Sequence, residues 1–176
     1  PECEFYGINT RKALLSVSAV DNNGNDILPA ISSIDGRPAP ADENEDMNYY
    51  ILDFGRVNAD YVKLVFDGWR ADIIRNPVKN GVAGSIELMN ADGKWEKIRD
   101  IGEISGDFKT MVIPLRGVFK NRKDHRIKVN NYGKRHHLNM YDRIRLDTSS
   151  DIALNFKRLS ASEADLTFAG MPTLDG

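Results

Sequence analysis

Three histidines are the first residues of this chain whose chemistry suits a metal site. His125, His136 and His137 all lie in one basic stretch, and imidazole is a common ligand for transition metals. Their spacing argues against such a site, because neighbouring strand residues point to opposite faces and none of the three has a partner two residues away. Cys3 is the only cysteine, so neither an internal disulfide nor a thiolate cluster can form. We therefore expect no cofactor.

A short acidic turn offers a second, weaker metal candidate. Asp21, Asn23 and Asn25 place oxygen atoms at alternate positions, and Asp26 adds a second carboxylate. A calcium loop of the helical-hand type needs glycine at its sixth position and glutamate at its twelfth, but this chain has Asp26 and Ser32 there. The Asn-Gly step inside the segment predicts a tight hairpin turn, which accounts for the same residues without calcium.

No pattern for catalysis is complete in this sequence. Ser85 follows Gly84, but the next residues are Ile and Glu, so the G-x-S-x-G nucleophile turn is missing. A glycosidase needs two carboxylates across a cleft, and the sequence gives no basis for choosing a pair among 26 acidic residues. Glycine-rich phosphate loops are absent as well. We therefore predict a protein that is not an enzyme, and assign no catalytic residue.

Charge is distributed unevenly along the chain, although the net charge is only −2. Residues 1–55 hold ten acidic and three basic residues, a net charge of −7, whereas residues 116–145 hold ten basic and two acidic residues, a net charge of +8. Such fields can steer a charged partner; two solvated edges are the simpler interpretation. The cations that we take as candidate partner-binding residues are Lys120, Arg122, Lys123, Arg126, Lys134 and Arg135.

The basic segment favours an acidic protein surface or an acidic glycan over nucleic acid. Tyr132 is the one aromatic residue inside residues 120–137, so stacking on bases has little support, and the isoelectric point is near 6.0. Trp69 and Trp95 are further candidate contact residues, because tryptophan supplies a large contact area to sugars and proteins. Packing at strand ends is the alternative role for both.

Alternating apolar residues predict an all-β fold. One strand is expected from Ala13 to Val20, with Leu15, Val17 and Ala19 on one face, followed by the Asn-Gly turn and a return strand from Ile27. Further inward-facing positions recur down the chain: Val62, Leu64, Phe66; Ile86, Leu88; Met111, Ile113, Leu115; Ile127, Val129; Ile144, Leu146; Ile152, Leu154, Phe156; Leu166, Phe168.

These segments indicate about ten strands. Unequal loops between them favour a jelly-roll-like antiparallel β-sandwich, similar to galactose-binding domains, over a closed barrel. The length suits a single domain over residues 1–176, with an exposed acidic loop at 35–46 that contains two prolines. No apolar run approaches the roughly 18 residues of a membrane span.

From residue 50 to residue 168 the chain resembles the β-rich region of secreted bacterial proteins that carry FG-GAP repeats with a UnbV/ASPIC segment, often together with tetratricopeptide repeats. The resemblance rests on residues 52–55, 62–69, 93–95, 100–102, 106–111, 126–130, 140–144 and 164–168. The chain departs from the family pattern at Tyr141, where tryptophan is usual, at Ala169, where arginine is usual, and in the longer loop 132–137.

This resemblance implies a non-enzymatic, extracytoplasmic module within a larger protein, and it carries over no site residue. We therefore expect a β-sandwich binding or assembly module that contacts a protein partner or a neighbouring domain through its charged faces. A carbohydrate-binding module or a carbohydrate-active enzyme domain is the alternative.

Overall fold

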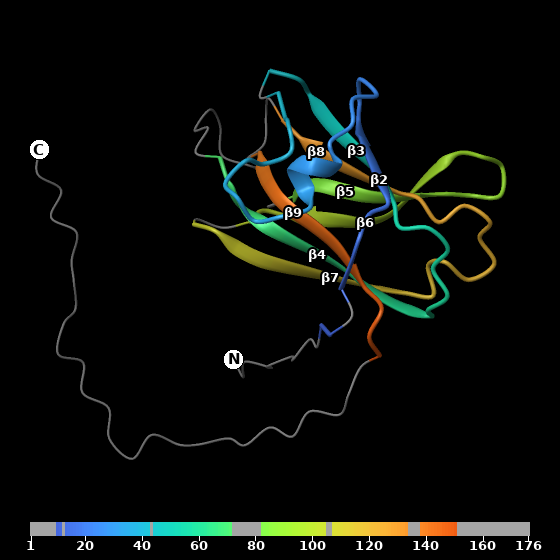
Figure 1. Cartoon of the computed structure of the whole chain (residues 1–176). Coiled ribbons are helices and arrows are strands. Elements are labelled where there is room, and N and C mark those ends of the chain that lie inside the picture. The colour runs from blue at the N-terminus through green and yellow to red at the C-terminus, as the bar shows by residue number, and fades with distance from the viewer. Residues whose placement is uncertain are drawn as a thin grey trace, which may run out of the picture.

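The computed structural model describes residues 10–11, 13–42, 44–71, 82–104, 107–133 and 138–150. This part of the chain contains nine β-strands, one 3₁₀ helix and no α-helix (Figure 1), so it holds no helix long and apolar enough to cross a membrane. The strands are β1 (Ala13–Leu15), β2 (Ser18–Asp21), β3 (Met47–Asp53), β4 (Tyr61–Arg70), β5 (Val82–Met89), β6 (Trp95–Gly102), β7 (Lys109–Arg116), β8 (Ile127–Tyr132) and β9 (Asn139–Asp147). The strands expected at 152–156 and 166–168 lie outside the described residues.

The strands form two antiparallel sheets that pack face to face. The four-stranded sheet has the order β1-β9-β4-β7, and the five-stranded sheet has the order β2-β3-β8-β5-β6. From β3 to β9 the chain changes sheet at every connection except the hairpin between β5 and β6, which is the connectivity of a jelly roll. The predicted antiparallel β-sandwich is confirmed.

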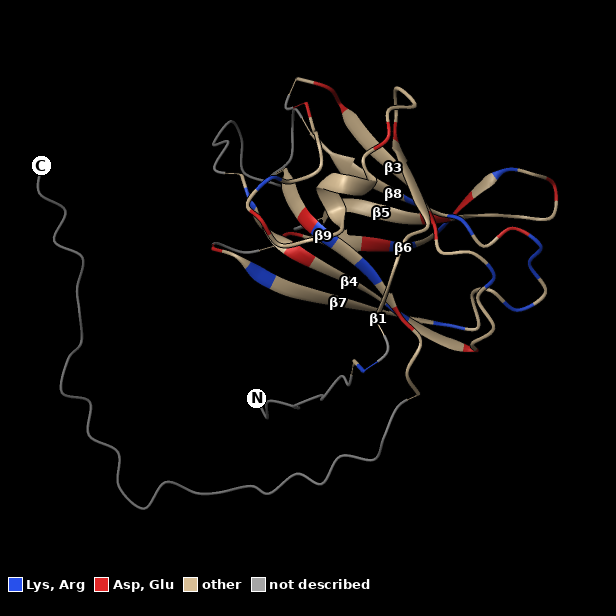
Figure 2. Cartoon of the chain, in the orientation of Figure 1, with Lys and Arg blue, Asp and Glu red and all other residues tan. Residues whose placement is uncertain are grey.

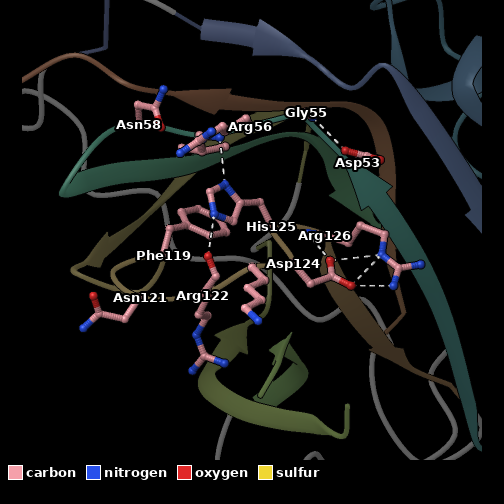
Figure 3. A pocket seen from close by; sticks show the side chains of 12 residues that line it. Asp53, Gly55, Arg56, Asn58, Phe119, Asn121, Arg122, Asp124, His125 and Arg126 are labelled. Atoms are coloured by element: carbon pink, nitrogen blue, oxygen red, sulfur yellow. Dashed lines mark hydrogen bonds and ion pairs between the residues drawn. The ribbon is translucent and has the colours of Figure 1, made fainter. Parts of the chain in front are cut away.

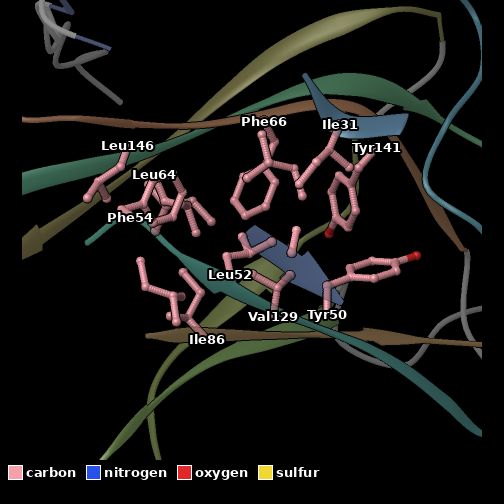
Figure 4. Close-up of a cluster of buried hydrophobic side chains, with 14 of the residues drawn as sticks. Ile31, Tyr50, Leu52, Phe54, Leu64, Phe66, Ile86, Val129, Tyr141 and Leu146 are labelled. Atoms are coloured by element: carbon pink, nitrogen blue, oxygen red, sulfur yellow. The ribbon is translucent and has the colours of Figure 1, made fainter. Parts of the chain in front are cut away.

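The core lies between the two sheets and is built from the alternating residues of the sequence (Figure 4). Val62, Leu64 and Phe66 of β4 are at most 1% exposed, as predicted. Tyr141 of β9 packs against Phe66 with ring centroids 4.8 Å apart, and against Tyr50 of β3 edge to face at 6.3 Å. The predicted inward positions of β5, β7, β8 and β9 are also buried: Ile86, Leu88, Ile113, Leu115, Ile127, Val129, Ile144 and Leu146; Met111 is partly buried against the core.

The prediction of one strand from Ala13 to Val20 is wrong. The chain passes from the four-stranded to the five-stranded sheet between β1 and β2, which pair with β9 and β3 respectively. Leu15 and Val17 are therefore 45% and 65% exposed, while Ala19 is buried. Alternation identifies extended structure, but it does not show that a strand changes sheets within three residues.

The predicted return strand after the Asn-Gly turn is also absent. Gly24 has φ of 80°, and its amide donates a hydrogen bond to the Asp21 carbonyl, so the turn itself forms as expected. Only an isolated bridge between Val20 and Asp26 follows, and then a 3₁₀ helix, η1 (Leu28–Ile31), with a proline in its first turn. Proline has no amide hydrogen for a sheet and fits the start of a helix.

Asp67 organises the outer face of the four-stranded sheet. Its Oδ2 accepts hydrogen bonds from Arg143 Nε and Arg145 Nη2, both at 2.9 Å, and its Oδ1 accepts one from Thr110 Oγ1 at 2.6 Å. Burial raises the pKa of this carboxyl, but the hydrogen bonds from Thr110 and Arg143 and the charges of both arginines outweigh it, so the net pKa lies below 3.8. The carboxylate thus links β4, β7 and β9.

We expect Asp67→Asn to lower the free energy of unfolding by roughly 1–3 kcal/mol at pH 7, because the arginines lose their counter-charge in a mostly buried site. The folded-state pKa lies below that of the unfolded chain, so the carboxylate stabilises the fold above pH 3.8 and this stabilisation is lost as the pH falls through the lower, folded-state pKa. Urea denaturation across this range should show the difference between wild type and variant shrinking at acidic pH. Asp92→Asn, in an exposed turn, should have little effect; an equal loss in both variants would contradict the role of Asp67.

Candidate binding site

A pocket of about 910 Å³ opens at one end of the sandwich, where three loops meet (Figure 3). Residues 54–60 connect β3 to β4, residues 90–94 connect β5 to β6, and residues 117–126 connect β7 to β8. The first and third loops are joined by a 2.6 Å hydrogen bond from the Gly117 amide to the Asp60 carbonyl. The pocket walls come from residues 53 and 55–58, and from residues 119 and 121–126 of the β7–β8 loop.

His125 holds the two walls of the pocket together. Its Nδ1 accepts a hydrogen bond from the Val57 amide at 2.8 Å, so the ring proton is on Nε2, which donates to the Arg122 carbonyl at 3.1 Å. The ring also packs on Phe119 with centroids 5.1 Å apart. Both nitrogens are occupied by these structural contacts, so His125 positions the loops and is not placed to bind a metal ion.

Arg122 ties the β5–β6 hairpin to the same loop. Its guanidinium donates to the carbonyls of Val118 and Met89 at 2.8 Å and 2.6 Å, and pairs with Glu96 at 3.0 Å. Within the loop, Asn121 has φ of 64°, a left-handed conformation that asparagine tolerates better than most residues. Arg122, which the sequence marks as a candidate binding residue, therefore has a mainly structural function at the pocket wall.

The two carboxylates of the pocket each accept hydrogen bonds, and one of them is ion-paired. Asp124 and Arg126 form a bidentate ion pair that includes a 2.5 Å contact between Arg126 Nη2 and Asp124 Oδ2. The hydrogen bonds from Arg126 lower the pKa of Asp124, and Asp124 in turn raises the pKa of Arg126. Asp53 accepts a hydrogen bond from the Gly55 amide at 2.7 Å. The charge of Asp124 is therefore neutralised by Arg126, whereas Asp53 keeps its negative charge.

Three cations at this end of the molecule have no such pairing. Arg56, Lys120 and Lys123 are exposed, and in the described part of the chain their side chains make no hydrogen bond or ion pair. Arg56 and Lys123 line the pocket. Lys120 lies on the β7–β8 loop together with Lys123. Basic segments of the β7–β8 loop stand out at this end in Figure 2. This end of the sandwich, formed by residues 53–60 and 117–126, is thus positively charged and can attract an anionic group. We call it the basic loop end.

The structure brings together only some of the residues expected from the sequence. Arg122, Lys123 and Arg126 line the pocket, with Lys120 beside it. Trp69 lies at the opposite end of β4 and packs on Phe108, with centroids 6.3 Å apart, while Trp95 begins β6 on the five-stranded sheet. Lys134 and Arg135 lie outside the described residues, as do His136 and His137.

Arg56 is the pocket residue that the sequence prediction missed. It follows the acidic first segment along the chain and has no basic neighbour there. Only the pairing of β3 with β8, which sets Leu52 opposite Ile127, carries residues 53–58 to the basic loop. No local signal in the sequence marks this residue.

The acidic turn at Asp21 is closed by its own hydrogen bonds. Asp21 Oδ1 accepts from the amides of Asn23 and Asn25 at 2.8 Å and 2.9 Å, and Oδ2 accepts from Asn25 Nδ2 at 2.9 Å. Burial raises the pKa of Asp21, but these bonds outweigh it and leave the pKa lowered. Asp26 accepts from the Leu28 amide. Across the described residues, no group of three or more histidine, cysteine or acidic side chains could hold a metal ion.

No protein-family model matches this sequence, and no curated protein matches it either.

We expect His125→Ala to lower the free energy of unfolding by about 1–3 kcal/mol, because the buried Val57 amide loses its acceptor and Phe119 loses a packing partner. Urea denaturation would measure this effect. Asn58→Ala, at an exposed pocket position without a side-chain hydrogen bond, is the matched control. Equal stability of the two variants would show that His125 does not hold the loops together.

Proposed function

We propose that this protein is a non-catalytic binding module that contacts an acidic protein partner through its basic loop end. The observation that carries the proposal is the pairing pattern at the pocket: the carboxylates Asp53 and Asp124 are engaged, whereas Arg56, Lys120 and Lys123 are exposed and make no pair with described residues. Charges arranged in this way raise association rates and select a partner of opposite sign.

The contacts within the pocket favour binding over catalysis. His125 uses both ring nitrogens to join loops, and Asp124 is held ionised by Arg126, so neither is poised to take up or release a proton on a substrate. Arg122 is fixed by three hydrogen-bond acceptors. The pocket therefore offers a hydrogen-bonded wall with exposed cations at its rim, which suits recognition of carboxylates.

Residues 50–168 resemble secreted FG-GAP and UnbV/ASPIC proteins. This resemblance supports an extracytoplasmic location for the module and a place within a larger protein or complex. A surface that recognises a neighbouring domain or subunit fits such a setting, because interfaces between domains resemble transient protein–protein interfaces and are more polar than obligate ones.

The proposal predicts that reversing the two free charges of the pocket removes binding to an acidic chain. Poly-glutamate serves as the probe, and affinity is measured by isothermal titration at 20 mM and 500 mM salt. The double variant Arg56→Glu/Lys123→Glu should bind at least roughly tenfold more weakly at low salt, and this difference should shrink at high salt.

Arg37→Glu is the matched control, since it reverses an exposed arginine in the acidic loop, far from the pocket along β3. It should leave the affinity for poly-glutamate unchanged. Equal affinity of the double variant and wild type, or binding that is indifferent to salt, would contradict the proposed function.

A further inference from the structure

A second surface lies on the outer face of the five-stranded sheet and combines aromatic rings with polar groups. Lys128 of β8 places its Nζ 4.7 Å from the ring centroid of Tyr49 on β3 and 5.9 Å from that of Trp95 on β6. The two rings thus flank one ammonium group. We refer to Tyr49, Lys128 and Trp95 as the aromatic strip.

Strand register explains why these side chains share one face. Lys128 lies opposite Ile51 on one side and Glu87 on the other, and its neighbours Ile127 and Val129 point into the core. Tyr49 is two residues from Ile51, so it points to the same side of β3. The strip runs diagonally across four strands, where rings and long side chains can reach one another. Tyr49 and Trp95 are partly exposed to solvent.

The charges on this face are neutralised, unlike those of the loop end. Lys128 pairs with Glu87 at 3.0 Å, and Lys97 pairs with Asp100 at 3.0 Å. At the end of the sheet, Arg126 pairs with Asp124. A ligand that binds along the strip therefore meets no excess of either charge, which favours an uncharged ligand over an acidic one.

Polar groups lie beside the rings. Asn130 follows Lys128 on the same face of β8 and donates from Nδ2 to Ser85 Oγ at 2.9 Å. Its Oδ1 is buried and accepts no hydrogen bond in the described part of the chain, so Asn130 lies beneath the strip and the polar groups at its surface are those of Lys128 and Glu87. Aromatic faces next to hydrogen-bonding groups match a sugar ring, whose C–H faces are apolar and whose edge carries hydroxyls.

We infer that the aromatic strip is a binding site for a neutral polysaccharide, separate from the basic loop end. Tyr49 and Trp95 would pack on the C–H faces of the sugar rings. The Lys128–Glu87 pair supplies both a donor and an acceptor for hydroxyl groups. A protein partner fits the strip less well, because covering these ion pairs with an apolar surface costs desolvation that their attraction does not recover.

Affinity gel electrophoresis of the full chain tests the inference directly. The probes are soluble neutral polysaccharides of different linkage, namely hydroxyethylcellulose, xyloglucan, galactomannan and soluble starch, with polygalacturonate as the acidic comparison. We expect at least one neutral polymer to retard wild-type migration, and retardation to persist at 500 mM salt. Trp95→Ala and Tyr49→Ala should each weaken the interaction about tenfold or more.

Three further variants keep the result interpretable. Trp95→Phe retains a ring at the strip and should keep part of the affinity even if Trp95→Ala is poorly folded. Trp69→Ala removes the tryptophan at the far end of the four-stranded sheet and should bind like wild type. The double variant Arg56→Glu/Lys123→Glu should also be retarded normally, which separates this site from the loop end.

The inference is overturned if no neutral polymer retards the folded protein, or if Tyr49→Ala and Trp95→Ala migrate like wild type. Retardation by polygalacturonate alone, lost at high salt and in Arg56→Glu/Lys123→Glu, would also overturn it and would assign glycan binding to the loop end.

Discussion

Strand β8 is the element on which both proposed binding surfaces depend. It is hydrogen-bonded between β3 and β5, with Tyr50 and Ile86 lying opposite Val129 on its two sides. These three strands are far apart in the sequence, so their contacts form only when the five-stranded sheet assembles. Burial of Val129 and Ile127 fixes the register, because a slip by one residue would turn every side chain to the wrong face.

Two consequences follow from this central position. The chain entering β8 brings Asp124, His125 and Arg126 against residues 53–58 at the end of β3, which creates the pocket. Lys128, an outward-facing residue of β8, lies between the rings of Tyr49 and Trp95. One surface has exposed cations without pairs among the described residues, and the other has each cation joined to a carboxylate. The two surfaces are therefore suited to ligands of different charge.

The sequence predicts the sandwich well, because period-two alternation reports directly on which residues face a core. Val62, Leu64 and Phe66 illustrate this, since all three are expected to face the core and are buried. Alternation fails where the chain changes sheet, as at Leu15 and Val17, because exposure there depends on which partner strand is available.

The candidate sites are less predictable, since they are assembled from distant segments. The basic residues at 120–126 are visible in the sequence, but Arg56 joins them only through the β3–β8 pairing. The sequence also does not show which cations are engaged internally: Arg122 is bound to two carbonyls and Glu96, while Lys123 is exposed. Tyr49 and Trp95 lie 46 positions apart in the chain and meet around Lys128 only in the folded sheet.

The most direct test of the account is an NMR titration of the isotope-labelled protein with poly-glutamate at low salt. The account predicts that amide shifts change mainly in residues 54–58 and 117–126, and that these changes disappear when salt is raised. Shift changes confined to other parts of the molecule, such as loop 35–42 or the edge strand β1, or no change at all, would contradict the assignment of the basic loop end as the binding site.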